Sequence, residues 1–348
     1  MIAYTVYLEQ IPQLLRPLAR DYEVLVPAKV ADGFYDFVPW QEGVEIAWDY
    51  DLAYNTLKRY FLPPREDLIE YDLDSYTAKP VTEAPKRLLL GVHPYDLKGI
   101  NQLDQLMELG SPDLNYRARR DATVIFGMEP QTVATTAFWA TIGAAQVDYG
   151  YDLYWTKISP AAFYVQVGSP LGEEMLNTNI QTQVATAAER EAARREQVRI
   201  RSVARKQGLK YPWEETPAVL KKSWNSPLWK EGSRLCLACG SCVTVCPTCY
   251  CFDVKEEADD LLKTGRRYRE WDGCMLEGFA AIAGGHNFRS KAWERYRHRF
   301  FRKGKYIYDK IGELGCIGCG RCVAACTANI ASPVAVFNQL WEDTHHEK

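Results

Sequence analysis

The residues most able to do chemistry lie close together in the last third of the sequence. All eleven cysteines fall between Cys236 and Cys326, and the 235 residues before them contain none. Two runs share the spacing C-x2-C-x2-C-x3-C, and they are Cys236, Cys239, Cys242, Cys246 and Cys316, Cys319, Cys322, Cys326. Three thiolates at positions i, i+3 and i+6 of a loop can reach three corners of one cube, so this spacing is typical of [4Fe–4S] clusters.

Where a protein has two such runs, the fourth cysteine of each run binds the cluster of the other run. We therefore predict two crossed ligand sets. The first ligand set is Cys236, Cys239, Cys242 and Cys326, and the second is Cys316, Cys319, Cys322 and Cys246. Gly240 and Gly320 follow the second cysteine of each run, where glycine lets the backbone bend at little steric cost. Pro247 suits the first turn of a helix that begins at Cys246.

A pair of four-cysteine zinc sites is the alternative reading of these runs. Structural zinc usually takes C-x2-C pairs separated by a spacer, whereas these runs are triplets with a fourth cysteine four residues on. The spacing therefore favours iron–sulfur clusters. A disulfide framework is disfavoured in a cytosolic chain, because glutathione and thioredoxin keep thiols reduced there.

Three cysteines, Cys249, Cys251 and Cys274, lie outside the two runs. They are candidates for a third metal centre, for a redox-active pair, or for buried thiols that pack as small apolar groups near cluster sulfur. An extended backbone would place Cys249 and Cys251 on one face, and a helix would separate them. Because Pro247 favours a helical start, we expect packing or hydrogen bonding to cluster sulfur rather than chemistry of their own.

Composition limits the kinds of partner and the location of the chain. It has 348 residues, is 47% hydrophobic and carries a formal net charge of −3, which fits a two-domain globular protein and disfavours bulk binding to nucleic acid or to anionic membrane. The first residues do not resemble a signal peptide, so we expect a cytoplasmic protein. The most apolar long stretch, Ala122–Val147, is interrupted by Glu129, Pro130 and Gln131, so no membrane span is expected.

The region before the cysteines indicates a mixed α/β domain. Short apolar runs bounded by turn-forming residues predict buried strands at Tyr22–Val26, Leu88–Val92, Thr123–Phe126, Tyr151–Tyr154 and Ala162–Val167. Apolar residues at helical spacing predict a helix over Asp96–Leu109, and the Ala, Glu and Arg content of Gln183–Gln207 predicts a long exposed helix. We found no dinucleotide-binding glycine pattern, no phosphate-binding loop and no catalytic Ser/His/Asp set.

The domain organisation that follows has three parts. Residues 1–180 form a mixed α/β docking domain, residues 181–232 a helical connector, and residues 233–340 a helical dicluster ferredoxin domain. The fold class is therefore α+β. The 69 residues between Cys246 and Cys316 are more than a compact β-type ferredoxin needs, and we expect them to be helical, notably at Lys255–Leu262 and Lys291–Phe301.

A basic segment precedes the second cysteine run. Between His286 and Lys305 there are eight Lys or Arg residues and one acid, Glu294, interleaved with aromatic residues. Such a segment is a docking face for an acidic partner or a set of cations that offsets cluster and thiolate charge. A solvated helix face with its aromatic residues in the core is the plain alternative, and binding of single-stranded nucleic acid is disfavoured by the acidic whole.

Four stretches closely resemble one protein family: "CLACGSCVTVCPTCYCFDV" from Cys236, "WDGCMLEGFAAIAGGHNFR" from Trp271, "RHRFFRKGKY" from Arg297 and "CIGCGRCVAAC" from Cys316. The family is the iron–sulfur protein shared by sulfhydrogenase-type cytosolic nickel–iron hydrogenases, where it is the beta subunit, and by anaerobic sulfite reductases. The close match covers about Leu235–Ile330. A looser one includes "LLLGVHPYDLKGINQLD" from Leu88.

The resemblance implies a helical two-cluster ferredoxin domain that passes electrons between a flavin subunit served by NAD(P)H and a catalytic metallo-subunit, of nickel–iron hydrogenase or sirohaem sulfite reductase type. We therefore expect a non-catalytic electron-transfer subunit with two [4Fe–4S] clusters, active in anaerobic metabolism. A terminal disulfide or polysulfide reductase that uses Cys249, Cys251 or Cys274 is the alternative.

Overall fold

The computed structural model describes residues 2–346. Its largest element is a mixed sheet near the N-terminus with the order β10-β1-β9-β8-β7-β6-β2-β3, in which β2, β6, β7 and β8 run parallel and the other pairs are antiparallel. Its strands are β1 (Ala3–Tyr7), β2 (Glu23–Ala31), β3 (Phe34–Pro39), β6 (Arg87–Val92), β7 (Thr123–Met128), β8 (Leu153–Ser159), β9 (Ala162–Val167) and β10 (Gln183–Val184).

The central strands follow from their composition. Strand β7 is buried at every residue and β6 at all but its first, as expected for apolar runs covered on both faces of a sheet. The strands predicted from Leu88 and Thr123 are thus confirmed as β6 and β7, and those predicted from Tyr22, Tyr151 and Ala162 overlap β2, β8 and β9.

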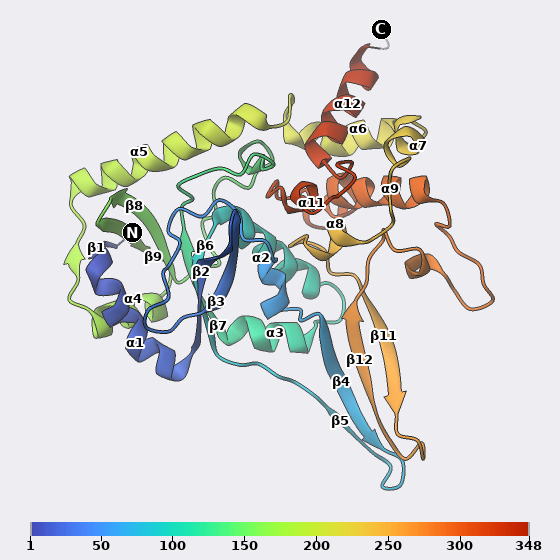
Figure 1. Ribbon diagram of the computed structural model, residues 1–348, viewed down its shortest axis with the longest axis horizontal. Helices are drawn as coiled ribbons and strands as arrows, with labels where there is room; N and C mark the ends of the chain where they lie inside the picture. The colour runs from blue at the N-terminus through green and yellow to red at the C-terminus, as the bar shows by residue number, and fades with distance from the viewer. Residues whose placement is uncertain (1, 347–348) are drawn as a thin grey trace.

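Helices surround this sheet, and the longest of them leads toward the cysteine-rich region (Figure 1). Helix α1 packs on β2 and α4, α2 and α3 pack on β7, and α5 packs on β8 and β9. Their bounds are α1 (Ile11–Asp21), α2 (Pro94–Met107), α3 (Leu114–Asp121), α4 (Pro170–Asn179) and α5 (Ala187–Ala204). The helices predicted at Asp96–Leu109 and Gln183–Gln207 are confirmed as α2 and α5, and α5 begins with a capping box between Thr186 and Glu189.

The C-terminal region is built from shorter helices around the two cysteine runs. Helix α9 continues into a π-helical turn, η7 (Arg302–Tyr306), so the helix expected from Lys291 is confirmed. The helices are α6 (Thr216–Lys222), α7 (Leu228–Gly232), α8 (Ser241–Thr244), α9 (Ala292–Phe301), α10 (Tyr308–Ile311), α11 (Arg321–Ala324) and α12 (Pro333–His346). Across the residues the structure describes, no helix is both long enough and apolar enough to span a bilayer.

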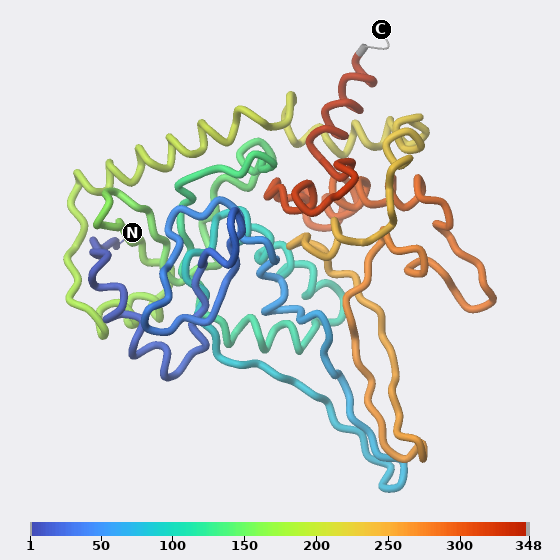
Figure 2. The backbone as a smooth tube through the Cα atoms, viewed as in Figure 1, coloured from blue at the N-terminus to red at the C-terminus, as the bar shows by residue number. Residues whose placement is uncertain are grey.

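A second sheet, with the order β11-β12-β4-β5, forms an arm that projects from the body (Figures 1 and 2). Its strands are β4 (Arg65–Asp72), β5 (Thr77–Pro80), β11 (Phe252–Ala258) and β12 (Thr264–Trp271). Strand β12 pairs with β4, so a segment from the first third of the chain and one from the last third share one sheet. The three-part division of the chain stays a prediction, and this pairing joins its first and third parts.

The helix expected over Lys255–Leu262 was wrong, because this segment is strand β11 and the turn after it. Its residues suit a helix by propensity, but each charge finds a partner across the sheet instead. Lys255 pairs with Glu270, Glu256 with Arg267, and Glu257 with Arg266. Cross-strand partners thus override the local helical preference.

The helix expected to begin at Cys246 was also wrong, because the chain makes a turn at Pro247 and Thr248. The Thr248 hydroxyl donates to the Gly315 carbonyl oxygen at 2.5 Å and accepts from Lys303 Nζ at 2.7 Å. These two bonds hold the segment against the second cysteine run, which a helix in this place could not reach.

Candidate metal centre

The two cysteine runs have the same local construction. In each run the second cysteine is followed by a glycine in the left-handed region, Gly240 with φ 76° and Gly320 with φ 87°, and that glycine begins a four-residue helix, α8 or α11. A side chain at Gly320 would also meet the Thr136 carbonyl oxygen at 2.7 Å. Helices α8 and α11 pack together, so the loops of the two runs lie side by side.

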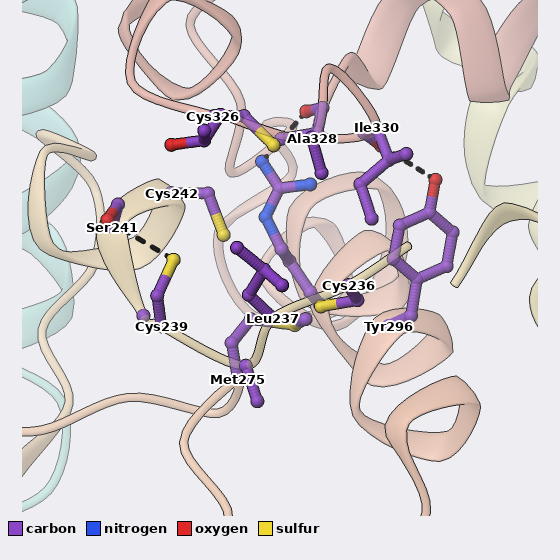
Figure 3. Close-up of a pocket in the computed structure, with 15 residues that line it drawn as sticks. Cys236, Leu237, Cys239, Ser241, Cys242, Met275, Tyr296, Cys326, Ala328 and Ile330 are labelled. Atoms are coloured by element: carbon purple, nitrogen blue, oxygen red, sulfur yellow. Dashed lines mark hydrogen bonds between the residues drawn. The ribbon is translucent and has the colours of Figure 1, made fainter. Parts of the chain in front are cut away.

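The first predicted ligand set lines one pocket. Cys236, Cys239 and Cys242 reach it from the first run, and Cys326 reaches it from the second (Figure 3). Cys239 lies at the exposed side of the pocket, where its sulfur is 3.3 Å from the Ser241 hydroxyl. Burial raises the pKa of Cys242 to about 12, against the lowering effect of Arg299.

The second predicted ligand set is also brought together, deeper in the protein. Burial raises the pKa of Cys319 to about 12, and nearby Cys246 and Cys322 raise it further against the effect of Arg321. Burial likewise raises the pKa of Cys316 and of Cys322, and Cys246 adds to both shifts. Cys246 therefore lies near all three sulfurs of the second run, although it belongs to the first run.

These two sets fit a cubane better than a single ion. Within residues 2–346, no three His, Cys, Asp or Glu side chains converge as the ligands of one metal ion would. Zinc holds its sulfur ligands at about 2.3 Å, which demands such convergence. A [4Fe–4S] cube carries its ligands on separate corners, and its iron stabilises the thiolate forms that burial alone disfavours.

Cys249 lies beside the second set and forms a hydrogen bond with the Cys246 sulfur, which lowers the pKa of Cys246 and raises that of Cys249. Burial raises the pKa of Cys274 to about 11, with a further contribution from Cys251. The segment after Pro247 is not helical, so no helix separates Cys249 from Cys251 as the sequence had suggested. Their role stays a prediction.

Residues of the N-terminal region cover the second set. Arg321 follows Gly320 and forms a bidentate ion pair with Asp96 of α2, at 2.6 and 2.8 Å. The Phe138 N–H donates to the Gly318 carbonyl oxygen at 2.7 Å, and a side chain at Gly318 would meet the backbone of Trp139. No sequence pattern indicates these partners, because they lie about 180 to 225 residues away along the chain.

Lysine side chains also reach the sulfurs without any signal in the sequence. Lys58 is buried, its ammonium group lies 3.9 Å from the centre of the Trp271 ring, and burial lowers its pKa while Cys249 and Cys246 favour its charged form. Lys303, from the basic segment, is buried and interacts with Cys246 and Cys249. The second set is thus surrounded by permanent or stabilised positive charge.

Comparison with known proteins agrees with this geometry. Residues 235–330 match the family model of the 4Fe-4S dicluster domain. Over 305 residues the chain is 30% identical to sulfhydrogenase 2 subunit beta of Pyrococcus furiosus, and the match covers 86% of this chain and 86% of that protein. The chain therefore belongs to the family of sulfhydrogenase beta subunits, and it is an iron–sulfur electron-transfer protein with two [4Fe–4S] clusters.

Proposed function

We propose that the chain is the non-catalytic electron-transfer subunit of a cytoplasmic multi-subunit oxidoreductase. It relays single electrons between a flavin subunit served by NAD(P)H and a catalytic metallo-subunit of nickel–iron hydrogenase or sirohaem sulfite reductase type. The carrying observation is that Cys326 joins the first cysteine run in one pocket while Cys246 lies among the sulfurs of the second run. The match to a sulfhydrogenase beta subunit supports the same reading.

The eight cysteines divide as two crossed sets. Cys236, Cys239, Cys242 and Cys326 hold the first cluster, and Cys316, Cys319, Cys322 and Cys246 hold the second. When bound, each cluster accepts and releases one electron at a time. The protein holds the thiolates, excludes water from the second set, and supplies N–H donors and positive charge to sulfur.

Unequal exposure of the two sets suggests a direction for the relay. The first set lies near the surface, beside the exposed side chains of Leu235 and Leu237. The second set lies under the N-terminal region, beneath Phe138, Trp139 and the Asp96–Arg321 pair. Electrons therefore pass to or from one partner at the first set, and the docking domain of residues 1–180 positions a partner for the second.

The crossed assignment is tested by combining cysteine substitutions in the anaerobically purified chain. The unsubstituted protein should hold about eight iron and eight acid-labile sulfide, as two cubes require. The double variant Cys236→Ala/Cys326→Ala should lose only one cluster, since both residues belong to one set. The double variant Cys236→Ala/Cys246→Ala should damage both clusters. Iron analysis and electron paramagnetic resonance count what remains, and the opposite pattern would mean that the runs are not crossed.

The triple variant Cys249→Ala/Cys251→Ala/Cys274→Ala is the matched control for loss of thiols nearby. It should keep both clusters and its partner-dependent turnover. If it keeps its iron but loses turnover with a disulfide or polysulfide, the chain is a terminal reductase rather than a relay. If the purified protein is iron-free, both readings fail.

A further inference from the structure

A stripe of buried positive charge runs along α9 and into η7. Arg295, Arg299 and Lys303 are spaced four residues apart, so they share one face of the helix, and only 5%, 2% and 3% of their surfaces are exposed. Burying a charged side chain is costly unless opposite charge and hydrogen bonds compensate for it. The basic segment therefore turns its costliest charges inward, toward the cysteines, and not toward solvent.

Arg299 is the member of this stripe whose hydrogen bonds are incomplete. Its Nη2 donates to the Ala331 carbonyl oxygen at 3.1 Å, but within residues 2–346 its Nε and Nη1 are buried and have no hydrogen-bond partner. Arg295 also leaves Nε unpaired, but its Nη1 donates to two carbonyl oxygens, those of Arg289 and Ser290. Lys303 donates to the Thr248 hydroxyl.

The position of Arg299 lies between the two ligand sets. Its side chain lines the pocket of the first set. It shares the Ala331 carbonyl oxygen with Cys322 of the second set, whose sulfur lies 3.6 Å from that oxygen. Sulfurs of both sets, Cys242 and Cys322 foremost, favour its charged form and raise its pKa against the effect of burial. One guanidinium thus faces sulfur from both runs.

We propose that Arg299 is a shared electrostatic bridge that donates its two free N–H groups toward sulfur of both clusters and raises both reduction potentials together. The inference rests on the proposed ligand assignment. Reduction adds negative charge to a cluster, and a buried cation with N–H donors stabilises that charge strongly where few other groups screen it. Because a guanidinium stays protonated at every working pH, the effect is independent of pH.

The test is a potentiometric titration of the full, cluster-loaded chain, followed by electron paramagnetic resonance. In Arg299→Gln both midpoint potentials should fall, with the equilibrium constant for one-electron reduction decreasing at least tenfold, or about 59 mV. Arg295→Gln is the matched control, because it removes a buried cation one helical turn earlier and should leave both potentials unchanged. Unchanged potentials in an Arg299→Gln protein with full iron content would overturn the proposal.

A second measurement covers the case in which Arg299→Gln does not retain its clusters. The unsubstituted protein is prepared with arginine that carries ¹⁵N only in the guanidinium group, and the hyperfine spectrum of the reduced first cluster is recorded. Arg299 is the arginine that lines this pocket, so a ¹⁵N coupling supports the bridge and its absence overturns it. An iron-free preparation would instead refute the proposed function itself, so the two failures are distinguishable.

Discussion

Glu129 shows how a single buried residue can make stability depend on pH. It follows β7, the Tyr154 hydroxyl donates to its Oε2 at 2.6 Å, and Arg201 Nε lies 3.6 Å from its Oε1. Burial raises the pKa of this carboxyl from 4.5 to about 7, although Arg201 and Tyr154 oppose the shift. The folded protein therefore binds more protons than the unfolded chain between these two values, and stability should fall as pH rises through that window.

We expect Glu129→Gln to remove this pH dependence. A shift of this size corresponds to roughly 3 kcal/mol across the window, and the amide keeps an acceptor for Tyr154. Anaerobic denaturation curves at pH 5 and pH 8 measure the difference for each variant. Glu174→Gln, on an exposed turn of α4, is the control and should keep the original dependence. A Glu129→Gln protein that still loses stability at pH 8 would place the titrating group elsewhere.

At this scale the sequence predicts thiols better than it predicts the groups around them. The spacing of cysteines within each run identifies the ligands, because a cube fixes the distance between loop positions. Arg299, Lys58 and Asp96 carry no comparable pattern. Each acquires its role from a contact with a distant part of the chain, and composition alone cannot distinguish a buried arginine from the exposed ones beside it in the basic segment.

Between elements, the strongest link is the ion pair from α2 to α11. Asp96 and Arg321 are each 1% exposed, and Arg321 Nε also donates to the Ala53 carbonyl oxygen at 2.7 Å. Removing one partner of a buried pair leaves an uncompensated charge and costs about 3–5 kcal/mol. We expect Asp96→Asn to lower the free energy of unfolding by about that amount and to speed the loss of iron from the second cluster.

The neighbouring pair Lys98–Glu313 provides a matched control, since it also joins α2 to the second run but is partly exposed, with 22% and 26% of its side chains accessible. Lys98→Met should cost about 1 kcal/mol or less, as exposed pairs do. Anaerobic denaturation and the rate of iron release compare the two variants. Equal costs would mean that burial does not distinguish the pairs.

The success of prediction at the level of elements depends on where an element finds its partners. Helix α5 and strands β6 and β7 follow from local patterns, because their own apolar spacing and capping residues are enough to define them. Strand β11 is stabilised by β12, which in turn pairs with β4. Its charged residues suit a helix equally well, so only the partner strand decides.

For the whole molecule, the surface around the first ligand set is the part through which electrons must leave or enter. Leu235 and Leu237 flank Cys236 there, with 67% and 71% of their surfaces exposed. We expect Leu237→Glu to keep both clusters and both potentials but to raise the KM for the partner at least tenfold, because docking would bury the new charge. Stopped-flow reduction by the partner protein measures this.

Leu261→Glu is the control, since Leu261 is as exposed as Leu237 but lies in the turn between β11 and β12, at the end of the arm. It should leave the KM unchanged. If Leu261→Glu slows electron transfer and Leu237→Glu does not, the partner meets the arm rather than the cysteine loop.

The pairing of β4 with β12 also affects how the protein is made. Glu270 pairs with Arg65 and Thr264 with Asp72, so about 200 residues must leave the ribosome before the β4–β5 hairpin meets its neighbour. At roughly 5–20 residues per second this takes about 10–40 s. During that interval one edge of the hairpin has open N–H and C=O groups, which is the kind of surface that chaperones bind. Translation of the C-terminal third completes a sheet that was begun in the first.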